Sequence, residues 1–214
     1  MKQFAVIGLG RFGSSLAKTL YSMGHQVLAV DISHENTQRM MDDVTHCVQA
    51  DTTDEEVLKS LGLRNFDAVV VSIGQDMQAS ILTTVLLKEM GVSFVIAKAN
   101  SALHGKVLER VGADKVVYPE RDMGERLAHS LISTNILDYI DISPEYSVME
   151  IAVGERLADK TLGELNLRAK YGVSVMVIKN NDKIQVAPGA GDWVREGDVL
   201  VVIGKPAALQ KIAL

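Results

Sequence analysis

The sequence predicts an α/β fold, in which a doubly wound parallel sheet over residues 1–140 precedes a small α+β domain over residues 141–214. Three observations predict this. Apolar Val/Ile/Ala runs alternate with helix-length segments through the first part of the chain. The glycine pattern Gly8-x-Gly10-x-x-Gly13 joins the first apolar run to the first helix, as in a Rossmann domain. The alternation stops near 141–144, where Asp-Ile-Ser-Pro introduces shorter strands and polar turns.

The first domain is expected to contain six strands, each followed by a helix. The strands are predicted at 4–8, 26–31, 46–51, 67–74, 94–99 and 115–119, and the helices at 11–23, 33–41, 53–61, 76–90, 103–111 and 122–136. Gly24, Gly91 and Gly112 follow three of these helices, the usual place for a helix-ending glycine. Because the strands are apolar along their whole length, we expect helices on both faces of a parallel sheet.

The second domain is expected to be a small mixed unit. Its strands are predicted at 145–153, 173–180, 183–188 and 198–204, with helices at 162–167 and 206–212 and a hairpin turn at Asn181-Asp182. A unit of this size is marginally stable alone, and pairing with a second copy would help it.

Composition excludes several classes of protein. The net charge of −5 argues against general nucleic-acid binding, which usually needs a basic surface. The longest apolar stretches are strand-sized, so no direct membrane insertion is expected. The first residues lack a basic segment followed by an apolar one, so a secretory signal is not expected either. The one cysteine, Cys47, fits a reducing cytoplasm and a core position rather than a nucleophile.

The glycine loop predicts a phosphate-binding site. Gly8 allows a tight bend, Gly10 lets the backbone approach a phosphate, and Gly13 packs the helix against the strand. The helix that follows offers free amides and a partial positive charge. Arg11 and Phe12 stand inside this loop, and a cation there raises the question of which negative charge it meets.

Asp31 ends the second strand, about 20 residues beyond the motif, where an acidic residue accepts hydrogen bonds from ribose hydroxyls. It would repel a 2′-phosphate, so the site is expected to favour NAD(H) or an adenine mononucleotide over NADP. Ile32 follows it as a further candidate.

The other strands end at the same edge of the sheet, where ligands of open α/β sheets bind. Asp51 and Thr52 either hold an adenine amino group or cap the next helix. Glu120 either begins a helix or holds a divalent cation beside phosphates. The remaining candidates at this edge are Ile73, Gly74, Lys98 and Ala99.

Catalytic residues are not evident. None of the five histidines has a recognisable catalytic spacing, and Lys98 is as well explained by a phosphate or structural role as by acid catalysis. The residues alone therefore give no support to catalysis, and a small NAD-dependent oxidoreductase stays open as the alternative function.

The segments FAVIGLGRFG, LAVD, SIGQDMQASILTTVLLKEMG and GADKVVYPERDMGERLA together resemble the RCK (regulator of potassium conductance) family. The similarity is greatest to the cytoplasmic regulatory subunits of Ktr-type potassium uptake systems. LNLRAKYGVSVMVIKN and VREGDVLVVIG resemble the family's C-terminal domain, so the resemblance covers essentially the whole chain.

The resemblance implies a non-enzymatic gating subunit. Such subunits form homodimers that assemble as an octameric ring at the inner face of the cell membrane, beneath a KtrB-like potassium-translocating subunit. ATP, ADP or NAD(H) binds the N-terminal domain and changes the shape of the ring. The implied role of Arg11 is to meet the terminal phosphate of ATP, including one bound by a neighbouring subunit.

The resemblance also implies that Glu120 helps to bind Mg²⁺ or Ca²⁺ beside the phosphates. In some relatives the paired C-terminal domains bind cyclic di-AMP. Asn166, Arg168 and Ile178 lie in the matching region, without a decisive signature for that ligand. The last helix of the first domain is expected to pack on a partner subunit or internally, through Met123, Leu127, Leu131, Ile132, Ile136 and Tyr139.

Overall fold

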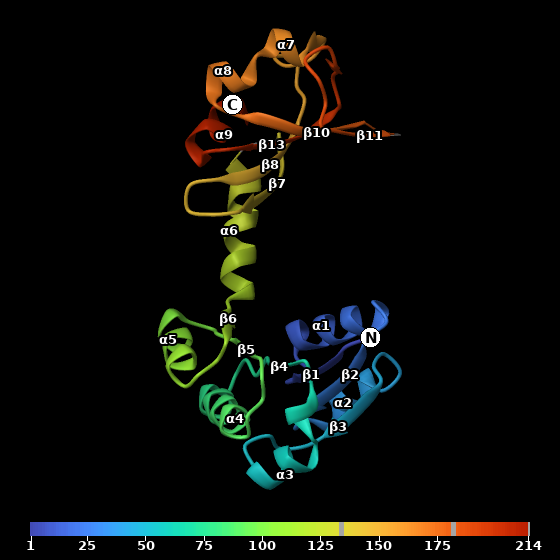
Figure 1. The fold of residues 1–214 in the computed structure, drawn as a ribbon, viewed down its shortest axis with the longest axis vertical. Coiled ribbons are helices and arrows are strands. Elements are labelled where there is room, and N and C mark those ends of the chain that lie inside the picture. The colour runs from blue at the N-terminus through green and yellow to red at the C-terminus, as the bar shows by residue number, and fades with distance from the viewer. Residues whose placement is uncertain (133–134, 181–182, 214) are drawn as a thin grey trace. The chain divides into compact units, whose positions relative to one another are not determined.

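The computed structural model describes residues 1–132, 135–180 and 183–213. The expected turn at Asn181-Asp182 and the side chain of Ile132 lie outside the described residues. The chain forms two compact units, Met1–Glu120 and Arg121–Leu214 (Figure 1). The division falls before the expected 140/141 boundary.

The first unit is a six-stranded parallel sheet with the order β3-β2-β1-β4-β5-β6. The strands are β1 (Gln3–Ile7), β2 (Gln26–Asp31), β3 (His46–Gln49), β4 (Ala68–Val71), β5 (Val95–Lys98) and β6 (Lys115–Val117). The helices are α1 (Arg11–Ser22), α2 (His34–Met40), α3 (Glu55–Ser60), α4 (Met77–Glu89) and α5 (Ala102–Arg110), with a 3-10 turn at Leu63–Asn65. The strand order reverses between β1 and β4, the point where doubly wound sheets bind ligands.

Both faces of this sheet are covered, as the apolar strands predict. Neighbouring residues of β1 enter different cores: Val6 packs with Ala17 of α1 and Met40 of α2, whereas Ile7 packs with the other core. That second core includes Leu58, Leu87 and Leu108, from α3, α4 and α5. The predicted glycine terminators are also confirmed, since Gly24, Gly91 and Gly112 all have positive φ angles.

The second unit begins with α6 (Pro119–Ile132), whose first two residues belong to the first unit. A five-stranded antiparallel sheet follows with the order β11-β10-β13-β8-β7. Its strands are β7 (Ile136–Asp141), β8 (Ser147–Ala152), β10 (Ser174–Asn180), β11 (Lys183–Val186) and β13 (Val199–Gly204). β9 (Lys160–Thr161) pairs with β12 (Trp193–Val194), and α7 (Leu162–Leu165), α8 (Leu167–Tyr171) and α9 (Pro206–Ala213) complete the unit.

The predicted helix over 122–136 is wrong at its C-terminal end. Residues from Ile136 onward form β7, which pairs antiparallel with β8, and Ile136 and Tyr139 are buried in the core of the second unit. Only Ile136 and Tyr139 are buried in this strand, and the irregular register between Ile136 and Asp138 allows both to enter the same core. Met123, Leu127 and Leu131 do lie on α6, with exposed fractions of 58%, 57% and 76%.

Candidate functional site

The loop between β1 and α1 is closely packed against the end of β4. Gly8 has a φ angle of +92°, and a Cβ there would lie 2.9 Å from the backbone nitrogen of Ile73. A Cβ on Gly13 would lie 1.9 Å from the Gly8 carbonyl oxygen and 2.5 Å from Ser72 Oγ. Ser72 Oγ donates a hydrogen bond to that same carbonyl at 2.5 Å. The first and third glycines of the motif are therefore required by packing and backbone conformation.

Gly10 has a different environment, because nothing lies within 4 Å of the position its Cβ would take. It is the N-cap of α1 and provides no side chain to bond the first-turn amides. The helices α2, α3, α4 and α5 all have such a bond, from Ser33, Asp54, Asp76 and Ser101. Among these five helices, α1 alone presents an exposed N-terminus without a side-chain cap, which suits an anionic ligand.

Asp31 holds this loop in place. Its Oδ2 accepts a hydrogen bond from the Leu9 amide at 2.5 Å, and its Oδ1 accepts one from the Ser33 amide at 2.8 Å. Asp31 is 9% exposed, while the neighbouring Ile32 is 66% exposed. Each carboxylate oxygen retains a further lone pair, so the residue is also able to accept from a ribose hydroxyl.

The end of β3 is organised by hydrogen bonds within the protein. Asp51 Oδ1 accepts from the hydroxyl and the amide of Thr53, and these bonds lower the pKa of Asp51. Thr52 is buried, with its Oγ1 3.0 Å from Thr83 Oγ1 on α4. Asp54 is the N-cap of α3, so the alternative that Asp51 or Thr52 caps this helix is wrong.

Lys98 and Glu120 form an ion pair at the ends of β5 and β6. Lys98 Nζ lies 2.6 Å from Glu120 Oε1, and their side chains are 10% and 65% exposed. The hydrogen bond from Lys98 lowers the pKa of Glu120, and the nearby Arg11 charge lowers it further. Lys98 Nζ is also 3.6 Å from the position that a Cβ of Gly74 would take. Arg11, Gly74, Lys98 and Glu120 are thus brought to one edge of the sheet.

Not every candidate contributes a side chain to this edge. Ala99 is 2% exposed, and its amide donates a hydrogen bond to the Val117 carbonyl, so it stabilises the sheet and does not face a ligand. Asn100 also belongs to this edge, because its side chain donates a hydrogen bond to the Gly74 carbonyl. The sequence did not predict this residue. Asn100 could have been identified as a candidate from its position, two residues after Lys98 and directly before Ser101, the N-cap of α5.

A metal site made by the protein alone is not found among the described residues. No group of three or more His, Cys, Asp or Glu side chains there has a suitable arrangement. A cation at Glu120 would therefore take most of its ligands from phosphate oxygens and water, as Mg²⁺ commonly does.

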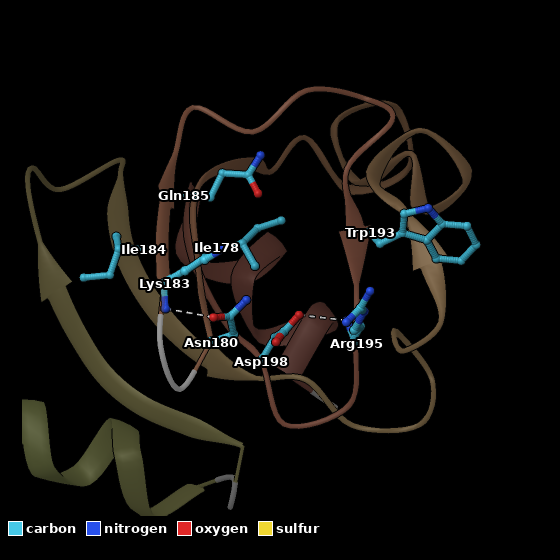
Figure 2. A pocket seen from close by; sticks show the side chains of 8 residues that line it. All are labelled: Ile178, Asn180, Lys183, Ile184, Gln185, Trp193, Arg195 and Asp198. Carbon is cyan, nitrogen blue, oxygen red and sulfur yellow. Dashed lines mark hydrogen bonds between the residues drawn. The ribbon is translucent and has the colours of Figure 1, made fainter.

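A concave surface lies in the C-terminal unit, with a volume of about 700 Å³ (Figure 2). Ile178, Asn180, Lys183, Trp193 and Arg195 are among the residues that line it. Asp198 also lines it and accepts a hydrogen bond from the Arg195 amide at 2.9 Å (Figure 2). Of the three residues that lie in the region matching the cyclic di-AMP-binding relatives, Ile178 lines this pocket. Asn166 lies between α7 and α8, and Arg168 lies on α8.

Comparison with known proteins follows the division into units. The TrkA-N domain family matches residues 4–119, and the TrkA-C domain family matches residues 147–213. Ktr system potassium uptake proteins C and A of Bacillus subtilis (strain 168) are each 49% identical over 95% of the chain, covering 92% and 91% of those proteins. The chain belongs to the Ktr family of potassium uptake proteins. A Vibrio alginolyticus Ktr system potassium uptake protein A is 40% identical over the same share of the chain and 92% of its own length.

Solved structures agree with the Ktr assignment at the level of the fold. The GsuK RCK domain has a TM-score of 0.70 at 20% identity, over 99% of this chain and 47% of that one. The NAD(P)-binding domain of an exopolyphosphatase-related protein from Archaeoglobus fulgidus matches 62% of this chain and 98% of that one, with a TM-score of 0.55 and 27% identity. No helix in the described part of this Ktr-family chain is long and apolar enough to span a membrane.

Proposed function

We propose that this Ktr-family chain is a nucleotide-binding regulatory subunit of a potassium uptake system. The uncapped N-terminus of α1 supports the proposal, because it lies at the β1/β4 switch point, and the Arg11 charge acts on the Lys98–Glu120 pair. This edge combines free amides, the cations Arg11 and Lys98, and the carboxylates of Glu120 and Asp31. Such a set suits a charged phosphate chain and, through Asp31, the ribose attached to it.

The ligand is proposed to be ATP or ADP, with NAD(H) as a competitor. The first-turn amides of α1 would receive phosphates, Asp31 would accept from the ribose, and Arg11 would meet the terminal phosphate of ATP. Structures of GsuK bound to NAD and to ADP exist, although that protein is 20% and 18% identical and supports the fold alone. Glu120 would contribute one oxygen to Mg²⁺ or Ca²⁺ bound with the phosphates.

The proposed role is regulation rather than catalysis. Asp31 is already bonded to two amides and Lys98 to Glu120, so both act as binding and structural groups at this edge. Family membership supports gating of potassium flow over the oxidoreductase alternative. A steady oxidation of NADH with a carbonyl substrate would support the alternative.

The proposed assembly is a homodimer that builds an octameric ring on a membrane potassium-translocating subunit, at the cytoplasmic face. A partner subunit on α6 is supported by its exposed apolar side chains, which are those of Met123, Leu127 and Leu131.

Strand β11 offers a second surface for assembly. It is an edge strand that is exposed along its length, with Ile184 69% and Val186 71% exposed. An apolar edge of this kind is normally covered. Native mass spectrometry would test the octamer.

Cyclic di-AMP is the proposed ligand of the pocket in the C-terminal unit. Its volume lies in the usual range for small-molecule sites, and Lys183 and Arg195 supply two positive charges for phosphates. Replacing Arg195 with alanine should weaken cyclic di-AMP binding, whereas Lys170→Ala on α8 is the control. If the unmodified chain shows no detectable binding of cyclic di-AMP, this ligand is excluded.

The first experiment is calorimetric titration with ATP, ADP and NADH in the presence of Mg²⁺, using the unmodified protein, Arg11→Ala and Arg110→Ala. A charged hydrogen bond contributes about 1.5–3 kcal/mol, so Arg11→Ala should weaken ATP binding by roughly 10- to 100-fold and ADP binding much less. Arg110 lies in the last turn of α5 and serves as the matched control. Equal losses for ATP and ADP would exclude the terminal-phosphate role.

A further inference from the structure

His104 is a fully buried histidine in the first turns of α5, with an exposed fraction of 0%. Its Nε2 is buried and has no hydrogen-bond partner among the described residues. Burying an unpaired polar group is unfavourable, and a leucine of similar volume would fill the space without that cost. Filling the core is therefore a poor explanation for a histidine here.

The other ring nitrogen of His104 makes a specific contact. Nδ1 accepts a hydrogen bond from the Asn100 amide at 3.4 Å. An imidazole that accepts at Nδ1 must be neutral and carry its proton on Nε2. Burial lowers the pKa of His104, which favours this neutral form.

Asn100 connects this contact to the nucleotide edge. Its side-chain amide donates to the Gly74 carbonyl, across from the end of β5 to the end of β4. Gly74 lies beside Lys98 Nζ, and the preceding Ile73 lies against Gly8 of the glycine loop. The backbone at 73–74 is therefore next to both the glycine loop and Lys98 of the Lys98–Glu120 pair.

We propose that His104 is a positioning residue for the nucleotide edge: its Nδ1 fixes the Asn100 backbone, and the Asn100 side chain then fixes Gly74. In this proposal, a fixed Gly74 keeps the glycine loop and Lys98 at a constant spacing, because residues 73–74 are next to both. The inference about ligand affinity rests on the proposed function, whereas the inference about Gly74 does not.

The test uses three variants of the full chain. His104→Asn keeps an acceptor at the position of Nδ1, because its Oδ1 is likewise bonded to Cγ. His104→Leu removes the acceptor at similar volume. Leu108→Ala, on the same helix and fully buried in the same unit, removes apolar packing without altering either partner of the Asn100–His104 hydrogen bond. Each protein is examined by hydrogen–deuterium exchange over residues 72–76 and by calorimetric titration with ADP and ATP.

His104→Leu should speed exchange over 72–76 and weaken both nucleotides by roughly three- to tenfold, the effect of about one lost hydrogen bond. His104→Asn should restore both readouts, and Leu108→Ala should lower thermal stability without changing either. Unchanged exchange over 72–76 in His104→Leu, or no rescue by asparagine, would overturn the proposal. If the unmodified chain binds no nucleotide, the proposed function fails, and the exchange comparison still decides the role of His104.

Discussion

Gly10 and Gly13 lie three residues apart in one loop, yet their surroundings differ completely. Gly13 has no room for a Cβ, which would meet the Gly8 carbonyl and Ser72 Oγ, whereas Gly10 faces open space. Gly10 has a φ angle of −66°, which any residue adopts. Gly13 is therefore required for packing, whereas Gly10 leaves open space at the N-terminus of α1.

This difference predicts opposite effects of the same substitution. Gly13→Ala should destabilise the chain by about 1–3 kcal/mol or more, because backbone atoms must move to admit the methyl group. Gly10→Ala should leave the free energy of unfolding nearly unchanged and weaken nucleotide binding, because its methyl group stands where phosphates are proposed to approach. Urea unfolding and calorimetry separate the two. Unaltered ATP and ADP affinity in Gly10→Ala would place the phosphates elsewhere.

His104 predicts a pH dependence of stability. Its pKa is lowered in the folded chain, while the unfolded histidine takes up a proton near its ordinary value of about 6.5. The unfolded state then binds more protons, so stability should fall as pH drops from about 6.5 towards 5, by at most about 1.4 kcal/mol per pH unit. Urea unfolding of the unmodified chain and His104→Asn across this range measures the difference. Identical pH slopes would assign the dependence to other groups.

At the scale of elements, the β7–β8 hairpin is held by buried polar groups. The Tyr139 hydroxyl donates to Ser147 Oγ at 2.8 Å, and Ser147 Oγ donates to Asp141 Oδ1 at 2.6 Å. His129 of α6 stacks on the Tyr139 ring with centroids 4.1 Å apart, and Arg126 contacts both oxygens of Asp138. These contacts fix α6 to β7.

The chain of hydrogen bonds from Tyr139 through Ser147 to Asp141 predicts which substitution lowers the free energy of unfolding more. Tyr139→Phe loses one hydrogen bond, about 0.5–1.5 kcal/mol, because Ser147 keeps its bond to Asp141. Ser147→Ala removes the hydroxyl that bonds both Tyr139 and Asp141, so two hydrogen bonds are lost and a destabilisation of about 1–3 kcal/mol is expected. Denaturant unfolding of the second unit measures both. A larger loss in Tyr139→Phe would contradict this order.

Most elements of the first unit were predictable from sequence, and the reason is physical. Long apolar strands, side-chain caps such as Ser33 and Asp76, and terminating glycines all indicate the same boundaries. Strand β7 was missed because its apolar residues continue the pattern of α6 without a glycine or proline between them. The short β9 and β12 carry too few residues for any periodicity.

The candidate site was predictable where a motif fixed it and unpredictable where distant residues meet. The glycine loop and Asp31 follow local spacing, so they could be named in advance. The Lys98–Glu120 pair joins residues 22 apart, and the Asn100–Gly74 contact joins residues 26 apart. The bond of Thr52 to Thr83 depends equally on how α4 packs, which sequence alone does not give.

At the scale of the whole molecule, the two units have separate cores. The residues of the proposed nucleotide edge all lie within Met1–Glu120, and the buried apolar clusters of that unit contain no residue of the other. The second unit has its own sheet and its own core around Met149, Ile151 and Leu200. Each unit therefore has the components of an independent domain.

We expect residues 1–120, expressed alone, to fold cooperatively and to bind ADP with an affinity comparable to that of the full chain. Circular dichroism during thermal unfolding tests the first expectation, and calorimetry tests the second. The full chain is the control for both. A fragment that folds but binds ADP much more weakly would show that the second unit or the assembly contributes to the site.

The two hydrogen bonds of Asp31 have a consequence for how this site is able to diverge. The same carboxylate that would distinguish between cofactors also ties down the loop through Leu9 and Ser33. A mutation that removed its charge to admit a 2′-phosphate would loosen the loop at the same time. Changes of ligand preference in this lineage are therefore expected to require compensating substitutions around the loop, which makes the preference slow to evolve.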